Sequence, residues 1–148
     1  EKDFFPLFEK GDGQLARTTV HDIYCAALSI LFEEEDSDPD FKRSFPFFLT
    51  KMLVEVLPYE NQVRQFEGKE RLTVEDVPVV TTIDEQTLPF DERFLRTAIP
   101  DGIAGLFMAD DDSKKAEAVL QYNKYVQACQ DIAPAVFEDL FTSEEDDV

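Results

Sequence analysis

His21 and Cys25 are the side chains best suited to metal chemistry. They lie four residues apart in a helical pattern, so they share one helix face, and Asp22 is adjacent. That spacing could supply two zinc ligands. A structural zinc site needs about four ligands, and the chain has a single histidine and no CxxC motif. We therefore interpret His21 as a helix-start residue and Cys25 as a core residue, and we expect no metal and no cofactor.

A second metal motif is incomplete. Asp36, Asp38 and Asp40 alternate like the opening of an EF-hand loop, which also needs Gly at its sixth position and Glu at its twelfth. Phe41 and Phe47 occupy those two positions. The pattern therefore predicts no calcium site of this type.

Catalytic chemistry has little support in the sequence. One histidine limits acid–base catalysis near neutral pH, although carboxylates with shifted pKa values can substitute. Carboxylates are abundant, so an enzyme that uses two acids stays open as an alternative; it would need a concave pocket containing perturbed acids. The segment Gly11-Asp12-Gly13 lacks the Lys and Ser of a phosphate loop. We expect a protein without catalytic residues.

The charge of the chain excludes several kinds of partner. Fourteen basic and 33 acidic residues give a formal net charge of −19, which repels nucleic-acid phosphates and anionic lipid surfaces. Thirteen of the acids lie in three runs, Glu33 to Asp40, Asp110 to Asp112 and Glu144 to Asp147, as is typical of solvated loops and tails. We expect no direct nucleic-acid binding and no membrane binding. An acidic inhibitor that mimics DNA remains an alternative, and it requires acids aligned on one folded face.

The elements that would position these residues are helices. The chain has 148 residues, 43% of them hydrophobic, which fits one globular domain. It contains no window of about 18 apolar residues and does not open on an export signal, so we expect it in the cell interior. Apolar spacing predicts a first helix that starts near Thr18 or Thr19. A second should start at Asp38-Pro39, be interrupted at Pro46 and end at Leu57-Pro58, before a short helix that Gly68 terminates.

The second half of the chain should begin with a loop. Residues 69–90 lose the helical period, so we expect an extended loop there with at most one short strand pair. A helix interrupted at Pro100 should follow, in which small residues such as Gly102 and Gly105 allow a neighbouring helix to approach. Asp112 or Ser113 should cap the longest helix, whose wide apolar face suggests contacts on two sides. The prediction is an all-α fold, a small bundle of about five helices with proline-interrupted helices and one long extended loop.

The ends of the chain are the predicted protein-binding segments. We divide the chain into an apolar arm (1–17), a helical domain (18–133) and a short amphipathic segment followed by an acidic tail (134–148). Each end contains a short apolar cluster that Gly or Pro separates from the helical core, and we expect these clusters to dock onto neighbouring subunits or partners. Closing the chain's own core is the alternative role. The predicted binding residues are Phe4, Phe5, Leu7, Phe8, Val136, Phe137, Leu140 and Phe141.

Several motifs follow one another in the second half of the chain. Residues 87–107 contain Leu88-Pro89-Phe90-Asp91 followed by a helical run with Ala98-Ile99-Pro100 and a small-residue segment. An acidic break at Asp110 to Asp112 and a helix with Tyr122 and Tyr125 come next. This order of motifs resembles structural proteins of tailed phages and prophages. The likeness extends upstream to the first helix and covers about residues 18–132.

This resemblance implies a head-tail connector or neck adaptor, a small helical protein of virion assembly. Such a protein works without an active site. Its expected partners are portal or tail proteins and copies of itself in a ring, and its expected location is the cytoplasm of the host cell or the virion. The sequence alone therefore leaves three alternatives: an assembly protein, an acidic inhibitor and a carboxylate enzyme.

Overall fold

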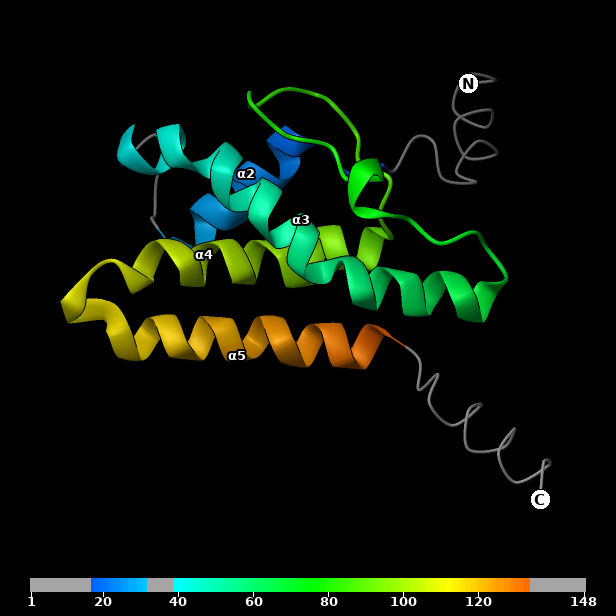
Figure 1. The fold of residues 1–148 in the computed structure, drawn as a ribbon. Coiled ribbons are helices and arrows are strands. Elements are labelled where there is room, and N and C mark those ends of the chain that lie inside the picture. Colours follow the sequence, from blue (N-terminus) through cyan, green and yellow to red (C-terminus); the bar gives the residue numbers. More distant parts are fainter. Residues whose placement is uncertain (1–16, 32–38, 134–148) are drawn as a thin grey trace, which may run out of the picture.

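The computed structural model describes residues 17–31 and 39–133, which form an all-α bundle. Within these residues there is no strand, which confirms the predicted fold class; four α-helices stand where about five were expected. The helices are α2 (Val20–Leu31), α3 (Pro39–Glu67), α4 (Ile99–Ala109) and α5 (Lys115–Ile132) (Figure 1). Three single turns complete the order: η1 (Val74–Asp76), η2 (Phe94–Ala98) and η3 (Asp112–Lys114).

Helix α2 starts where the sequence predicts. The Thr19 hydroxyl accepts a hydrogen bond from the Asp22 amide at 3.1 Å, and the Asp22 carboxylate accepts one from the Thr19 amide at 3.0 Å. This reciprocal pair satisfies amides that a helix start leaves unpaired. The amides of Val20 and His21 donate instead to the carbonyls of Gln86 and Asp84, at 2.9 and 2.8 Å. The start of α2 is therefore joined to the far end of the long loop.

Helix α3 continues through both of its prolines, so the predicted end at Leu57-Pro58 is wrong. A proline inside a helix removes one backbone hydrogen bond and costs about 3 kcal/mol. Eleven residues of α3 are buried, on both sides of Pro58, and their burial offsets that cost. Gly68 adopts a φ of 77°, the left-handed conformation expected of a helix terminator.

Residues 69–91 form the long loop that the sequence predicts, and side chains of α3 hold its first half. The Thr50 hydroxyl accepts a hydrogen bond from the Val80 amide at 3.0 Å. Asn61 makes a pair of bonds with Leu72: its amide group donates to the Leu72 carbonyl at 2.9 Å, and its carbonyl accepts from the Leu72 amide at 2.8 Å. Polar groups of the helix thus replace the neighbouring strand that an extended segment would otherwise need.

Two charged residues of α3 hold the ends of the same loop. Glu60 is 3% exposed and accepts a hydrogen bond from the Asp91 amide at 2.9 Å and one from Arg64 at 2.7 Å. The Arg64 guanidinium also donates to the carbonyls of Glu70 and Pro89, each at 3.0 Å. We call Thr50, Glu60, Asn61 and Arg64 the loop clamp.

The helix that contains Pro100 is continuous because its geometry widens just before the proline. The turn η2 is π-helical and passes directly into α4, with Pro100 in the first turn of α4. Proline lacks the amide proton that a regular helix would use, and a π turn is a known way to absorb such an interruption. The predicted interruption at Pro100 therefore takes the form of a change of pitch.

Helices α4 and α5 pack closely through glycine, as the small residues predict. A Cβ added at Gly105 would lie 3.2 Å from the Tyr122 nitrogen and 3.3 Å from the Ala118 oxygen, both backbone atoms of α5. A Cβ at Gly102 would lie 3.1 Å from the Tyr125 ring. A Cβ at either position would be closer than ordinary van der Waals contact, so glycine favours this close approach of the two helices.

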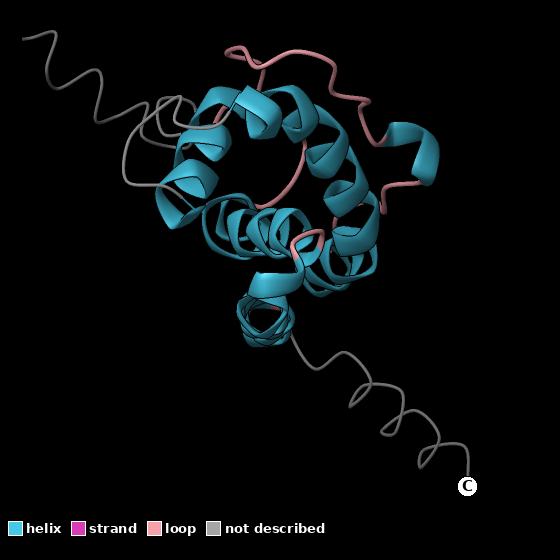
Figure 2. Cartoon of the chain, turned by 90° about the vertical axis from the view of Figure 1, so that its left-hand side faces the viewer, coloured by secondary structure: helices cyan, strands magenta, loops and turns pink. Residues whose placement is uncertain are grey.

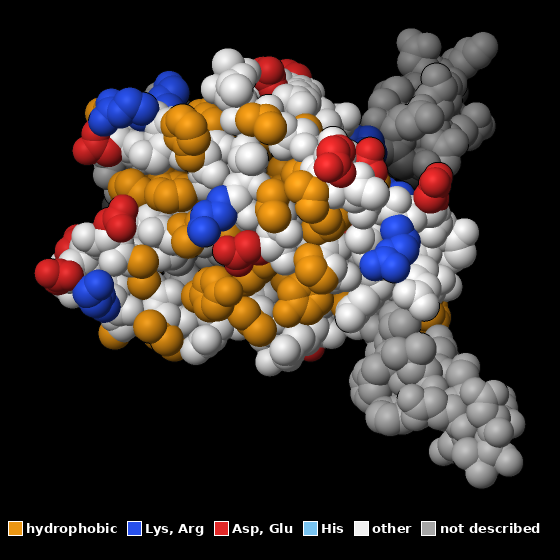
Figure 3. All heavy atoms as spheres, viewed as in Figure 1, with side chains coloured by type: hydrophobic (Ala, Val, Ile, Leu, Met, Phe, Trp, Pro, Cys, Tyr) orange, Lys and Arg blue, Asp and Glu red, His pale blue; other side chains and the backbone are white. Residues whose placement is uncertain are grey.

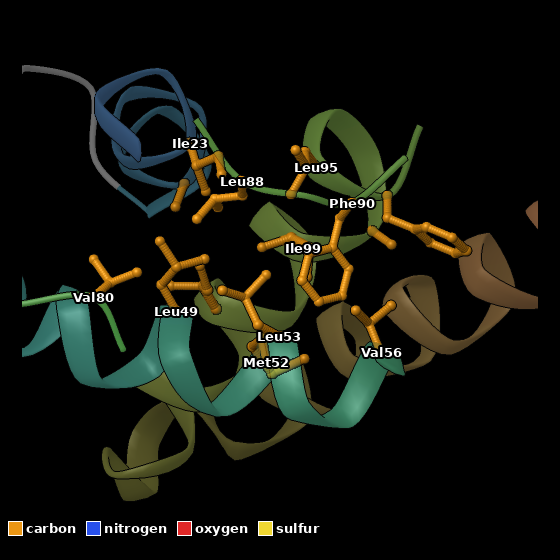
Figure 4. Close-up of a cluster of buried hydrophobic side chains, with 14 of the residues drawn as sticks. Ile23, Leu49, Met52, Leu53, Val56, Val80, Leu88, Phe90, Leu95 and Ile99 are labelled. Atoms are coloured by element: carbon orange, nitrogen blue, oxygen red, sulfur yellow. The ribbon is translucent and has the colours of Figure 1, made fainter. Parts of the chain in front are cut away.

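The hydrophobic core lies between α2, α3, η2, α4 and the long loop, and Tyr125 and Cys129 of α5 pack into it (Figure 4). Figure 4 shows Leu49, Leu53 and Val56 of α3 directed toward side chains of the other elements. The core also receives Val80, Leu88 and Phe90 from the loop, all of them buried. The loop is therefore part of the core, which explains why α3 holds it with so many hydrogen bonds.

A candidate protein-binding groove beside helix α5

Helix α5 packs on one side only within the described residues. Ala118, Tyr125 and Cys129 are its buried residues, and they face the rest of the bundle. In Figures 1 and 2, α5 lies below α4 at the edge of the bundle, with no described element on its outer side. The predicted contacts on two sides are therefore not made by the part of the chain that the structure describes.

Large apolar side chains of α5 are consequently exposed. Val119 is 59% exposed, Leu120 60% and Tyr122 41%. Exposed apolar residues are common one at a time, but Val119 and Tyr122, three residues apart, lie on one face of the helix, and apolar side chains gathered on one face mark interaction surfaces. Leu120, the residue after Val119, lies on a different face. The apolar face of α5 is thus wider than its neighbours in the described structure can cover.

A groove runs along this exposed side between α4 and α5. Its volume is about 240 Å³, and its walls come from the carboxyl-terminal part of α4 and the amino-terminal half of α5. The lining residues are Gly105, Leu106, Ala109, Ala118, Val119, Tyr122 and Asn123. We call this the α4–α5 groove. Gly105, Ala109 and Ala118 are the small residues of this lining, whereas the larger side chains Val119 and Tyr122 are exposed at its rim.

Helix α3 extends the apolar surface beyond the groove. Phe47 is 76% exposed and Val54 43%. Figure 3 shows hydrophobic side chains gathered over α3 and α5 on one face, with a few charged groups between them. The ion pair of Lys51 with Glu55 belongs to the same helix face as Val54, with nitrogen and oxygen 3.8 Å apart. The surface therefore combines apolar area with isolated charges, as protein interfaces do.

Tyr122, which lines the groove, interacts electrostatically with Glu55 of α3. Burial, reinforced by the negative charge of Glu55, raises the pKa of the Tyr122 phenol. The phenol therefore stays neutral. It offers an apolar ring together with a polar hydroxyl group, the combination that makes tyrosine frequent at protein interfaces. Its ring lies 5.4 Å from the Tyr125 ring, centroid to centroid, which fixes it against the buried part of α5.

A second hollow, of about 410 Å³, lies between the end of α3 and the loop residues that precede η2. Four acidic and four basic side chains line it: Glu60, Glu67, Asp91, Glu92, Arg17, Arg64, Lys69 and Arg93. Desolvation by burial raises the pKa of Glu60, the property expected of an enzyme's acid.

The bonds of this hollow favour a structural role over catalysis. One carboxylate oxygen of Glu60 accepts a hydrogen bond from Arg64 and the other accepts one from the Asp91 amide. The Arg64 nitrogens also donate to two backbone carbonyls. Arg93 binds Asp91 through two nitrogens, at 2.9 and 3.0 Å. Arg17 donates to the Leu88 carbonyl. These groups connect the loop to the helices, so we assign the hollow to the loop clamp.

The described residues include His21 and Cys25, the candidate metal ligands of the sequence. The Cys25 sulfur lies 3.8 Å from both ring nitrogens of His21, so the two residues are adjacent as predicted. Among the residues that the structure describes, no three His, Cys, Asp or Glu side chains form a group that could hold a metal ion. Within 17–31 and 39–133, no helix is long and apolar enough to span a bilayer.

The binding residues predicted from the sequence lie outside the described residues. They are Phe4, Phe5, Leu7, Phe8, Val136, Phe137, Leu140 and Phe141. The sequence predicted a wide apolar face on this helix, but did not single out Val119 and Tyr122 as a binding site. The signal was the width of that face, which is greater than a helix with a single neighbour needs.

Comparisons with known proteins found no relative of this chain. No family model, no curated protein and no solved structure matches it.

Proposed function

We propose that this chain is a non-enzymatic assembly protein of a phage or prophage, of the head-tail connector or neck adaptor kind, acting through protein–protein contacts. Its place would be the cytoplasm of the host cell or the virion. One observation carries the binding part of the proposal: Val119 and Tyr122 are exposed on the rim of an apolar groove. The phage assignment rests on the sequence resemblance over about residues 18–132.

The groove fits an apolar helix of a partner. Its lining spans Ala118 to Asn123 along α5, five residue steps, or about 7.5 Å of helix length. That length accommodates two successive anchors of a helix that carries apolar residues at i and i+4. A partner helix laid in the groove would cover Val119 and Tyr122 and complete the packing of α5.

The distribution of charge supports a protein-binding role over mimicry of DNA. The described residues contain 12 basic and 18 acidic side chains, a net charge of −6 out of the chain's −19. A DNA mimic needs its acids on a folded face, whereas most of this excess belongs to residues other than those that the structure describes. The loop clamp likewise uses the buried acid Glu60 to hold the backbone of the loop. Burial raises the pKa of Asp101 as well as that of Glu60, but Asp101 does not line the hollow that contains Glu60, so the two acids do not share one pocket.

Titration with candidate partners tests the proposal. The portal and tail proteins encoded beside this gene would be purified and mixed with the full chain and with the variants Val119→Glu and Leu120→Glu. The two residues are adjacent and equally exposed, but only Val119 lines the groove. We expect Val119→Glu to weaken binding about tenfold or more, because a carboxylate would be buried unpaired, and Leu120→Glu to leave it unchanged. Equal effects of the two variants, or no binding by any portal or tail protein, would contradict the proposal.

A further inference from the structure

We propose that residues 78–81 of the long loop bind an extended segment of a partner protein, with basic residues at its ends, which pairs with the loop backbone as an added β-strand. This inference goes beyond the proposed function and does not involve the α4–α5 groove. Three observations carry it: hydrogen bonds on only one edge of the loop segment, alternating burial of its side chains, and acidic residues beyond both of its ends.

The loop segment is extended, but no strand lies beside it. β-Branched residues, which favour strands, fill every position of residues 77–83 except the proline. Val77 has φ −78° and ψ 120°, in the extended region, and the chain makes no turn or bend over residues 78–81. Within the described residues the one β-bridge joins Thr19 to Thr87. The strand pair that the sequence allowed is therefore not completed by the described part of the chain.

Helix α3 holds one edge of the loop segment. The Val80 amide donates to the Thr50 hydroxyl at 3.0 Å, and this hydroxyl lies 3.4 Å from the Val80 carbonyl oxygen. In an extended chain the amide and carbonyl of one residue point to the same edge, and those of the next residue point to the opposite edge. The backbone groups of Val79 and Thr81 therefore point away from α3, and they make no hydrogen bond within the described residues. We call these backbone groups the open edge.

Side-chain burial alternates along the segment as it does along a strand. Val80 is 3% exposed and lies in the core, where Figure 4 shows it, whereas Val79 is 74% exposed and Thr81 is also exposed. Pro78 has no amide proton, but it falls on the same edge as Val80, so it removes no donor from the open edge. In Figure 1 the green segment that follows η1 runs along the upper edge of the molecule. The open edge thus offers two amides and two carbonyls to a strand that approaches from solvent.

The charges around the open edge favour a partner segment with basic ends. Glu75 and Asp76 precede the loop segment, Asp84 and Glu85 follow it, and all four are exposed. Residues 73–87 include no basic residue. Lysine or arginine at both ends of an added strand would meet these carboxylates, and β-branched residues between them would pack beside the exposed valine of the segment. Main-chain hydrogen bonds of this kind supply the affinity when a peptide adds to a strand edge.

Amide hydrogen exchange of the full chain, followed by nuclear magnetic resonance, tests the edge assignment and the binding together. The probe is the peptide Lys-Val-Thr-Val-Thr-Val-Lys, added up to about 1 mM, the range of weak specific contacts. In the free chain we expect the Val80 amide to exchange slowly and the amides of Val79 and Thr81 to exchange fast. The bound peptide should slow exchange at Val79 and Thr81 about tenfold or more and leave Val80 unchanged.

Two variants at one position separate backbone pairing from side-chain contact. Thr81→Pro removes an amide of the open edge, and proline favours an extended conformation for the residue before it, here Val80. Thr81→Ala keeps the amide and removes the side chain. We expect Thr81→Pro to weaken peptide binding about tenfold or more, and Thr81→Ala to weaken it less than about threefold. Circular dichroism melting of each variant establishes that it is folded before its binding is measured.

Four results would overturn this inference. They are a peptide that does not bind, binding by Thr81→Pro as tight as that by Thr81→Ala, peptide protection at Val80 and not at its neighbours, and equal binding of the control peptide Lys-Val-Thr-Pro-Thr-Val-Lys. The control keeps the charge but cannot pair as a continuous strand. The proposed function is judged separately, because Val119→Glu leaves the open edge intact and Thr81→Pro leaves the α4–α5 groove intact.

Discussion

Substitution of Gly105 by alanine tests the close approach of α4 and α5 that forms the groove. In an isolated helix this change is favourable by about 1 kcal/mol, because alanine is the better helix former. Here the added methyl carbon would lie 3.2 and 3.3 Å from backbone atoms of α5, and backbone cannot move aside as a flexible side chain can. Overpacking of this kind costs about 1 to 3 kcal/mol. We therefore expect Gly105→Ala to lower the free energy of unfolding by about 1 kcal/mol after both effects are combined.

The assay is urea denaturation of the full chain, with thermal melting as a second reading. A loss of about 1 kcal/mol corresponds to a melting temperature about 4 °C lower for a domain of this size. The control is Ala116→Gly at an exposed position of α5, which measures the intrinsic difference between the two residues in this protein. If Gly105→Ala stabilises the chain by as much as Ala116→Gly destabilises it, α4 and α5 do not approach as closely as described.

Three further predictions concern the clamp, the pH dependence of stability and metals. Asn61→Ala removes both hydrogen bonds to the Leu72 backbone and should cost about 2 kcal/mol in urea denaturation; a loss below about 0.5 kcal/mol would show that the loop does not need the clamp. Burial raises the pKa of the Cys129 thiol from 9.0 to about 12 and also raises that of the Tyr125 phenol, so the unfolded chain loses these protons first. Stability should therefore be full below about pH 9 and fall as the pH rises above it, and a flat profile to pH 10.5 would contradict the burial of the two groups. Addition of a chelator should leave the melting temperature unchanged, since no complete ligand set is expected; a large drop would reveal a structural metal.

The elements that sequence reasoning located well depend on local chemistry. Thr19 and Asp22 form a cap through side chains three residues apart, and Gly68 takes the backbone conformation that few other residues adopt. Gly102 and Gly105 indicated a close helix contact because no other reason favours glycine inside a helix. Each of these features is decided within one or two turns, so the sequence pattern is sufficient to predict it.

The elements that sequence reasoning misplaced depend on packing across the chain. Pro58 remains inside α3 because buried residues on both sides outweigh one lost hydrogen bond, a balance that local propensity does not contain. For the same reason α3, and not α5, is the longest helix. Asp112 or Ser113 was predicted to cap α5, but the N-cap of α5 is Lys114, which makes no side-chain cap bond. Asp111 instead caps the preceding turn η3, where its side chain accepts a hydrogen bond from the Ser113 amide at 3.0 Å. Three consecutive aspartates offer the same chemistry, and tertiary geometry selects among them.

The candidate site was harder to predict than the fold. The spacing of apolar residues along α5 predicted a wide apolar face, but not which part of that face the rest of the bundle covers. That division depends on where α4 lies, which Gly105 fixes through a contact with Tyr122 and Ala118. The loop clamp was also missed, because Asn61 and Arg64 bind backbone groups, and backbone groups leave no signal in the sequence.

Side-chain labelling of the unmodified chain tests most directly whether the α4–α5 groove is a binding surface. A photogenerated carbene modifies exposed side chains, and mass spectrometry reads the labelling of each residue. We predict that the labelling of Val119 and Tyr122 falls as the chain is concentrated, or as a portal or tail protein is added, while that of Leu120 stays constant. Labelling of Val119 and Tyr122 that remains as high as that of Leu120 under every condition would contradict the account.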